Sequence, residues 1–238
     1  VWALGYTGQG VVVGGQDTGY QWDHPALISQ YRCWNGTTAN HDYNWHDAIH
    51  SGGGSCGADS TEPCDDHGHG THTMGTICGL APNDTIGVAP GAQWIAANTI
   101  VGGNLSSQVL QTMQWLADPD GDPTTMDDVP DVANNSWGVH EGFGYPDCYN
   151  GWWEAIDACE AAGVAHVWAT GNEGPAGGTV RSPADRASDN KPTYLSLMNG
   201  SFTTPQTGYA SSWPGNLSDF VFAAPSSLPP IFIDERLL

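Results

Sequence analysis

The stretch D-D-H-G-H-G-T-H-T-M-G-T, residues 65–76, places three histidines within six residues, where a polar turn gives way to a helix. The helix is predicted to run from His69 to about Cys78, because Gly79-Leu-Ala-Pro follows and this combination ends helices. An imidazole at the start of a helix can serve as a metal ligand or as a general base. Other residues of the chain distinguish between these two kinds of site.

Short apolar runs and helical patterns alternate on either side of this helix. Strands are expected at 10–14, 92–98, 131–135 and 164–169. Further helices are expected at 107–117 and 152–162. Such alternation predicts an α/β layered fold with a mainly parallel sheet flanked by helices. In sheets of this kind functional side chains gather at the carboxyl ends of the strands.

The composition is that of a folded and strongly acidic chain. Its 238 residues include 26 acidic and 5 basic side chains, for a net charge of −21. A polyanion repels nucleic acid and anionic membrane, so neither is expected as a partner. No apolar run reaches the roughly 18 residues that a membrane-spanning helix needs. Because the chain starts at Val1 without a leader pattern, we expect a processed or excised segment.

Six cysteines stand at positions 33, 56, 64, 78, 148 and 159, none of them in a C-x-x-C pair. Their even number, together with sequons such as Asn35-Gly-Thr and Asn104-Leu-Ser, is typical of a secreted, extracellular protein with disulfides. Proximity in sequence favours two local pairs, Cys148 with Cys159 and Cys33 with Cys56 or Cys64.

Two segments lack the strand and helix patterns. Residues 30–63 are rich in Gly, Ser, Asn and His, and are expected to form a long surface insertion tied by a disulfide. Residues 186–238 are repeatedly interrupted by proline and show no clear helix period. They are predicted to be a divergent Pro/Ser-rich tail in which the layered fold is incomplete or altered.

The three histidines of the opening stretch allow a metal-site interpretation. His67, His69 and His72 occupy the histidine positions of H-x-H-x-D-H, the pattern of metallo-β-lactamase-like hydrolases, in which they would hold zinc and an activated water. Thr71 stands where that pattern needs a carboxylate, and no matching histidines follow downstream. The sequence therefore favours a site in which a single histidine acts.

Three polar residues framed by glycines come at strand ends or helix starts. Asp17 follows the first strand in G-G-Q-D-T-G, His69 opens the helix, and Asn172 follows the strand at 164–169 in T-G-N-E-G. Glycine lets the backbone turn sharply and approach a ligand closely. This arrangement suits nucleophilic catalysis, in which a carboxylate orients an imidazole base.

Four sequence blocks, in order and suitably spaced, make residues 5–185 resemble the subtilisin-like serine peptidases (subtilases). The blocks are D-T-G with W-D-H-P-A-L at 17–27, H-G-T-H-x-x-G-T with G-V-A-P-G-A at 69–92, D-V-A-N-N-S-W-G at 131–138, and A-T-G-N-E-G at 169–174. The resemblance implies a subtilisin-like layered fold, with a catalytic scaffold over residues 1–185. It implies hydrolysis of peptide bonds in a polypeptide substrate without a required cofactor, and leaves the oligomeric state open.

The resemblance also implies roles for the three glycine-framed residues. Asp17 would hold the imidazole of His69 in the useful tautomer, and His69 would act as general base and then as general acid. Asn172 would donate its side-chain amide to the oxyanion, a contact worth about 3–4 kcal/mol in subtilisin. Taken alone, Asp17 and Asn172 are equally typical of turns, and His69 of a structural residue in a first helical turn.

A second set of residues is implied to bind the substrate. Ser136, Trp137 and Gly138 would line the cleft, pair their main chain with an extended peptide and border the pocket for the residue before the cut. The alternative is that Ser136 and Trp137 are core residues. The two other histidines of the opening stretch, His67 and His72, are interpreted as structural.

The nucleophile is missing from this pattern. The family carries its serine in G-T-S-M-A at the start of a buried helix, and this motif does not occur in the chain. In subtilisin the serine follows the oxyanion asparagine by about 66 residues, which is also the distance from Asn172 to Leu238. The chain is therefore expected to be truncated, read in a shifted frame, or altered.

Three explanations remain open. The chain is an Asp-His-Ser peptidase whose serine cannot be identified, an inactive relative that binds peptides, or an esterase that uses another serine near His69. The candidate serines of the tail are those at 188, 196, 201, 211, 212, 218, 226 and 227.

A possible calcium site completes the predictions. Asp118, Asp120 and Asp122 alternate in D-P-D-G-D, a spacing that suits a Ca²⁺ loop although it lacks the bidentate glutamate of an EF-hand. Subtilases often bind structural calcium, which the resemblance makes a candidate here. The alternative is a solvated acidic loop.

Overall fold

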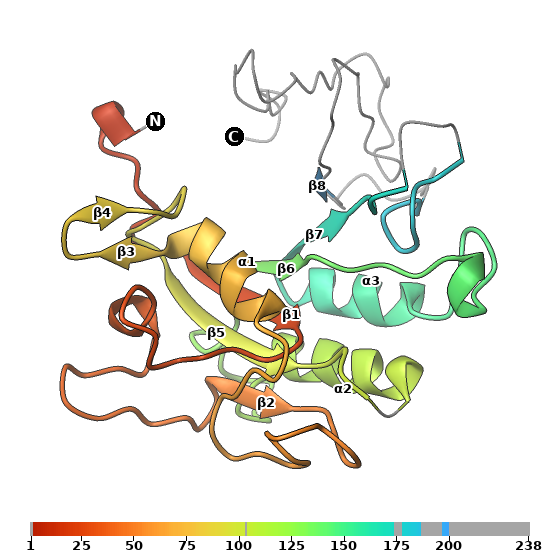
Figure 1. The fold of residues 1–238 in the computed structure, drawn as a ribbon, viewed down its shortest axis with the longest axis horizontal. Coiled ribbons are helices and arrows are strands. Elements are labelled where there is room, and N and C mark those ends of the chain that lie inside the picture. Colours follow the sequence, from red (N-terminus) through yellow and green to blue (C-terminus); the bar gives the residue numbers. More distant parts are fainter. Residues whose placement is uncertain (1, 103, 174–177, 187–196, 200–238) are drawn as a thin grey trace. The chain divides into compact units, whose positions relative to one another are not determined.

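A computed structural model of the chain describes residues 2–102, 104–173, 178–186 and 197–199 (Figure 1). The chain forms two compact units. The first contains residues 1–134 and 154–164, and the second contains residues 135–153 and 165–238. The predicted tail at 186–238 and its candidate serines lie almost entirely outside the described residues.

Four parallel strands form the sheet of the first unit, in the order β2-β5-β1-β6. Their bounds are Trp45–Asp47 for β2, Gln93–Asn98 for β5, Val12–Asp17 for β1 and Val132–Asn135 for β6. The register aligns the last residues of β1 and β5, Asp17 and Asn98. The parallel sheet predicted from the sequence is therefore confirmed, and Asp17 stands at the carboxyl end of a central strand.

Two helices pack against opposite faces of β1. They are α1, His69–Cys78, and α2, Leu105–Ala117 (Figure 1). Consecutive residues of a strand point to opposite faces. A Cβ added to Gly14 would come within 2.8 Å of Leu116 on α2, and one added to Gly15 within 2.9 Å of Met74 on α1. Glycine at both positions lets the two helices approach the strand closely.

Several elements remain besides these four strands and two helices. They are α3 (Trp153–Ala161), β7 (Ala165–Ala169), β8 (Leu197–Asn199), which pairs in parallel with β7, the antiparallel hairpin β3 (Leu80–Ala81) and β4 (Asp84–Thr85), and the 3-10 turns η1 (Trp2–Leu4), η2 (Ile28–Gln30) and η3 (Glu141–Phe143). The predicted helices and strands are present, with ends that differ by a few residues. None of the helices in the described ranges combines the length and apolar character that a membrane crossing requires.

The segment at 30–63 corrects one expectation. Its strand β2 pairs with β5, and Trp45, Ala48 and Ile49 are buried. Tyr31 also lies in the core, with its ring centroid 4.5 Å from that of Trp94. Only part of this segment is therefore a surface insertion, because its aromatic and aliphatic residues complete one edge of the core.

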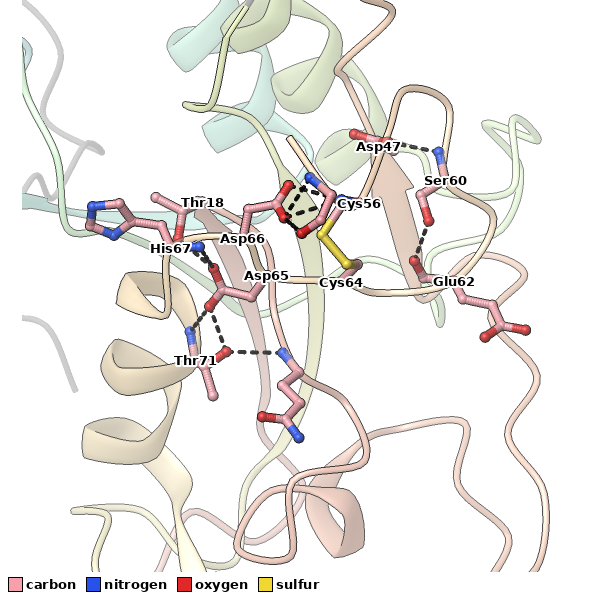
Figure 2. The surroundings of a disulfide bond; sticks show 12 residues. Thr18, Asp47, Cys56, Ser60, Glu62, Cys64, Asp65, Asp66, His67 and Thr71 are labelled. Carbon is pink, nitrogen blue, oxygen red and sulfur yellow. Dashed lines mark hydrogen bonds between the residues drawn. A yellow bond between two sulfur atoms is a disulfide. The ribbon is translucent and has the colours of Figure 1, made fainter. Parts of the chain in front are cut away.

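The disulfide pairing differs from the local pairs favoured by sequence. Cys56 is bonded to Cys64 (Figure 2). Cys33, Cys148 and Cys159 are free. Burial separates the predicted pair, because Cys159 is buried on α3 and Cys148 is exposed. Both predicted pairings are wrong. The segment at 30–63 is nevertheless connected by a disulfide, as expected, because Cys56 lies within it and Cys64 directly follows it.

A tryptophan cluster forms the core of the second unit. Trp137 meets Trp152 and Trp168 edge to face, with ring centroids 5.6 and 5.2 Å apart. All three side chains are buried, and edge-to-face contacts suit aromatic quadrupoles. The indole of Trp137 is thus a core group, which agrees with the alternative given above and leaves its main chain for other contacts.

Candidate active site

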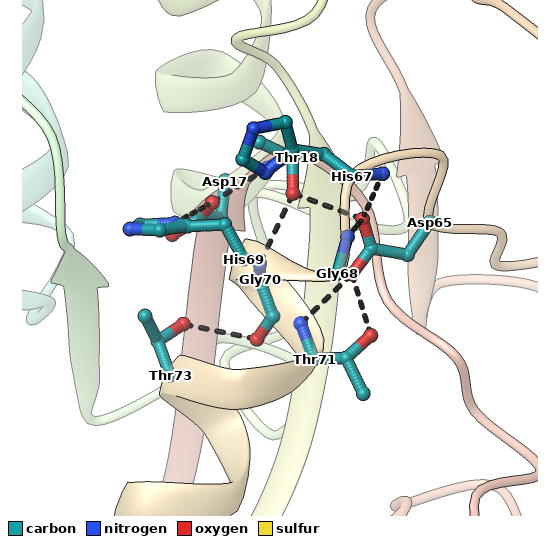
Figure 3. A network of polar contacts seen from close by, with 9 residues as sticks. All are labelled: Asp17, Thr18, Asp65, His67, Gly68, His69, Gly70, Thr71 and Thr73. Carbon is teal, nitrogen blue, oxygen red and sulfur yellow. Dashed lines mark hydrogen bonds and ion pairs between the residues drawn. The ribbon is translucent and has the colours of Figure 1, made fainter.

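Asp17 and His69 meet where β1 ends and α1 begins. The Nδ1 atom of His69 lies 2.6 Å from Oδ1 of Asp17 (Figure 3). The carboxylate is fully buried, whereas 40% of the imidazole side chain is exposed. An ionised carboxylate can only accept a hydrogen bond, so Nδ1 must donate and the bond selects the tautomer with hydrogen on Nδ1. The Nε2 atom is then a base.

The hydrogen bond to Asp17 raises the pKa of His69 above its ordinary value of 6.5. Partial burial of the imidazole opposes this shift, and the negative charges of Asp17 and Asp65 add to it. The carboxylate therefore favours the imidazolium form, as a general base requires when it takes up a proton. Oδ1 of Asp17 also accepts the Thr18 amide at 2.7 Å, and its Oδ2 is buried without a partner among the described residues.

Glycines permit the close approach of the two segments that carry this pair. Gly19 has a φ of +105°, and a Cβ there would collide with the Cys64 carbonyl oxygen. A Cβ on Gly70 would collide with the Gly19 carbonyl oxygen. The D-T-G and H-G-T-H blocks therefore need glycine for a steric reason, which the sequence indicated only as freedom to turn.

The zinc interpretation of the three histidines is wrong. His69 engages Asp17 through Nδ1, and the His67 and His69 rings lie edge to face with centroids 6.2 Å apart. Throughout the described ranges, the one group placed to hold a metal ion consists of Asp118, Asp120 and Asp128. His67 and His72 are exposed, and neither joins such a group.

The three aspartates of that group each offer an oxygen within 4.8 Å of the others. One oxygen of Asp118 and one of Asp128 are buried without a hydrogen-bond partner among the described residues, so the group fits a cation. Asp122 is outside this group, and its Oδ1 accepts the amide and hydroxyl of Thr124 at 3.0 and 2.7 Å. Asp128, which sequence spacing missed, stands in place of Asp122.

The other residues predicted from the sequence belong to the second unit. The backbone amide of Asn172 donates to Oε2 of Glu173 at 2.9 Å, and Glu173 forms an ion pair with Arg181. Arg181 also donates to the carbonyl oxygen of Gly138 at 3.3 Å. The segments of Asn172 and Gly138 are thus connected through one arginine. Ser136, in the same block as Gly138, is partly exposed.

Sequence reasoning missed Glu173 and Arg181. The guanidinium lowers the pKa of Glu173 to about 2, chiefly through its hydrogen bonds. Arg181 also lies 5.4 Å from the ring centroid of Phe143, in cation–π geometry. The available signal was weak, because a lone arginine among 5 basic residues has no recognisable pattern.

Sequence comparisons identify the family. The profile described as "Subtilase family" matches residues 8–213. Bacillopeptidase F of Bacillus subtilis (strain 168) is 38% identical over 199 residues, which are 77% of this chain and 13% of that protein. Minor extracellular protease Vpr of the same strain is 34% identical over 185 residues, which are 76% of this chain and 20% of that protein. The chain therefore spans a small part of either relative.

Solved structures are similar in fold. Sphericase superposes with a TM-score of 0.56 at 21% identity, over 87% of this chain and 60% of that one. The nisin leader peptidase NisP from Lactococcus lactis superposes with a TM-score of 0.52 at 24% identity, over 72% of this chain and 46% of that one. At these identities the likeness concerns the fold alone.

Proposed function

Since the chain belongs to the subtilase family, we propose that it forms the scaffold of a serine-type peptidase that uses Asp17 and His69. The 2.6 Å hydrogen bond between His69 Nδ1 and Asp17 Oδ1 is the observation that carries this proposal. A buried carboxylate that faces a half-exposed imidazole is what a general base with a fixed tautomer requires. The catalytic scaffold is taken as residues 1–185.

Each member of the pair has a distinct task. Asp17 fixes the imidazole orientation and stabilises the imidazolium that forms when His69 removes the proton of a serine hydroxyl. His69 then returns this proton to the leaving amine, so one residue serves as base and acid in turn. The nucleophilic serine is not assigned to a residue.

Asn172 is proposed as the oxyanion donor, through its side-chain amide. Ser136, Trp137 and Gly138 are proposed to receive an extended substrate by main-chain hydrogen bonds. The exposure of Asn172 and the burial of the Trp137 indole support this division, because the first side chain is accessible and the second fills the core.

The proposed substrate is a polypeptide, and the proposed location is extracellular. Both relatives are named as peptidases, and the name of Vpr describes an extracellular enzyme. The Cys56–Cys64 disulfide supports the location, because disulfides persist outside the reducing cytosol.

A fluorophosphonate probe tests this proposal, because it labels only an activated serine. We expect one serine to be labelled and to be located by mass mapping of the peptides. His69→Ala should abolish the labelling, whereas His72→Ala, a change in the same helix, should preserve it. If the intact chain takes up no label, both the peptidase and the esterase are excluded, and the inactive peptide-binding relative remains.

Substrate comparison separates the two enzymes. A peptidase is expected to hydrolyse casein, and an esterase to hydrolyse p-nitrophenyl acetate alone. Hydrolysis of casein that is lost in His69→Ala would support peptide-bond cleavage by the proposed base.

We further propose that Asp118, Asp120 and Asp128 bind a structural calcium ion, with Asp128 replacing the predicted Asp122. Two observations support this assignment: the three carboxylates converge, and one oxygen each of Asp118 and Asp128 is buried without a hydrogen-bond partner among the described residues. Calcium prefers carboxylate oxygens and requires no particular spacing in sequence.

A further inference from the structure

Asp65 accepts five hydrogen bonds immediately before α1. Its Oδ1 accepts the Thr18 hydroxyl at 2.9 Å and the amides of Gly68 and His67 at 2.8 and 3.1 Å (Figure 3). Its Oδ2 accepts the amide of Thr71 at 3.0 Å and the Thr71 hydroxyl at 2.5 Å. One carboxylate therefore satisfies amides that have no partner within the helix and also contacts the end of β1.

Thr18 completes a second connection between β1 and α1. It directly follows Asp17, and its hydroxyl oxygen accepts the amide of Gly70 at 3.0 Å while donating to Asp65. Gly70 in turn directly follows His69. The hydroxyl of Thr18 thus connects the backbone of Gly70 with the carboxylate of Asp65. It joins the end of β1 to the start of α1, as the bond between His69 and Asp17 also does.

The main chain of Asp65 is held independently of its side chain. Cys64, its neighbour, forms the disulfide with Cys56 (Figure 2). The carbonyl oxygen of Cys64 also accepts the amide of Tyr20 at 3.0 Å. Asp65 itself forms a β-bridge with Gly19. The backbone that carries the carboxylate is therefore held by contacts in which the carboxylate takes no part.

We propose that Asp65 is a positioning residue of the Asp17–His69 pair. Its carboxylate fixes the start of α1 against the end of β1, so that the imidazole meets Asp17 in hydrogen-bonding geometry. This inference rests on the proposed function, since it assigns to that pair a residue that touches neither substrate nor the reacting atoms. It extends the site by one carboxylate that spacing and resemblance did not identify.

Nuclear magnetic resonance of the full chain tests the proposal without an assay of activity. The low-field proton on His69 Nδ1 reports the bond to Asp17, and the ring proton on Cε1 reports the pKa of His69. In Asp65→Asn, one carboxylate oxygen becomes an NH2 donor that faces donors. We expect the low-field resonance to weaken or vanish and the pKa of His69 to fall. Among the described residues, the titratable groups that face the imidazole are Asp17, Asp65 and His67.

Asp66→Asn is the matched control. Asp66 is the adjacent carboxylate, and its oxygens accept the Ser55 hydroxyl and the amides of Ser55 and Cys56 on the insertion side (Figure 2). This variant should keep both signals of His69. Loss of the Asp65 charge lowers the pKa of His69 even if the imidazole keeps its place, so the low-field resonance is the deciding signal. A folded Asp65→Asn protein with an unchanged low-field resonance would overturn the proposal, as would equal losses of that resonance in the two variants.

Thr18 supplies a second pair of variants if Asp65→Asn does not fold. Thr18→Val removes the bridging hydroxyl and should weaken the His69 resonance, whereas Thr18→Ser should retain it. Identical spectra for these two variants would contradict the proposal. Because these signals need no nucleophile, a chain that no fluorophosphonate labels still gives a decisive result for Asp65.

Discussion

At the scale of single residues, the candidate site depends on one short hydrogen bond and on the charge around it. The imidazole of His69 gains a partner on folding, which raises its pKa. Resemblance alone predicted that Asp17 and His69 act together. It did not predict that Asp65 would join them, because hydrogen bonds between segments 47 residues apart leave no periodic signal in the sequence.

Replacement of Asp17 by Asn should make stability less dependent on pH. In the native protein His69 holds its proton more tightly than in the unfolded chain, whose histidine titrates at about 6.5. The resulting stabilisation is present below this pH and is lost as pH rises through the raised pKa of folded His69. Urea unfolding at pH 5.5 to 9 should show the free-energy difference between wild type and Asp17→Asn shrinking with pH. A difference that stays constant would contradict the assignment.

The ion pair of Glu173 and Arg181 should contribute modestly to stability. Their side chains are 36% and 18% exposed, which places the pair near the surface. Exposed pairs contribute up to about 1 kcal/mol. A double-mutant cycle with Glu173→Gln and Arg181→Met, measured by urea unfolding, should give a coupling of about 0.5–1 kcal/mol that decreases with salt. A coupling indistinguishable from zero would mean that the pair does not join the segments of Asn172 and Gly138.

At the scale of elements, sequence patterns predicted helix and strand positions that depend on neighbouring residues. They missed features that depend on contacts between distant segments. The bounds of α1 match the prediction, because a polar turn precedes the helix and Gly79 follows it. The strand β2 was missed, since three residues, Trp-His-Asp, carry no strand pattern of their own. Likewise Asp128 joins Asp118 and Asp120 only because the loop after α2 folds back. The spacing of aspartates at every second position in D-P-D-G-D does not predict this contact.

The loop after α2 gives a prediction about calcium. If Asp118, Asp120 and Asp128 hold the ion, calcium added after chelation should raise the melting temperature. A ligand present at a hundred times its Kd stabilises by about 2.7 kcal/mol. Asp128→Asn should remove this increase, and Asp122→Asn should leave it largely intact. If Asp122→Asn removed the increase in melting temperature and Asp128→Asn did not, the D-P-D-G-D ligand set would be restored. If calcium did not raise the melting temperature of the wild type, the segment would be a solvated acidic loop.

At the scale of the whole molecule, the comparisons show membership of the family, whereas the sequence lacks the motif of the family's nucleophile. The profile match continues to residue 213, past residue 185 where the recognisable motifs end. Asp17 and His69 lie in the first unit, and Asn172 with residues 136–138 in the second. The fold class followed from strand and helix alternation, whereas the nucleophile could not be predicted, since its motif is absent from the sequence.

The rate of fluorophosphonate labelling as a function of pH tests the central claim most directly. A serine activated by His69 should react faster as the imidazole loses its proton. The inflection should therefore lie above pH 6.5 and coincide with the pKa of His69 measured by magnetic resonance in the same protein. A labelling rate that ignores this titration, or a chain that is never labelled, would contradict the account.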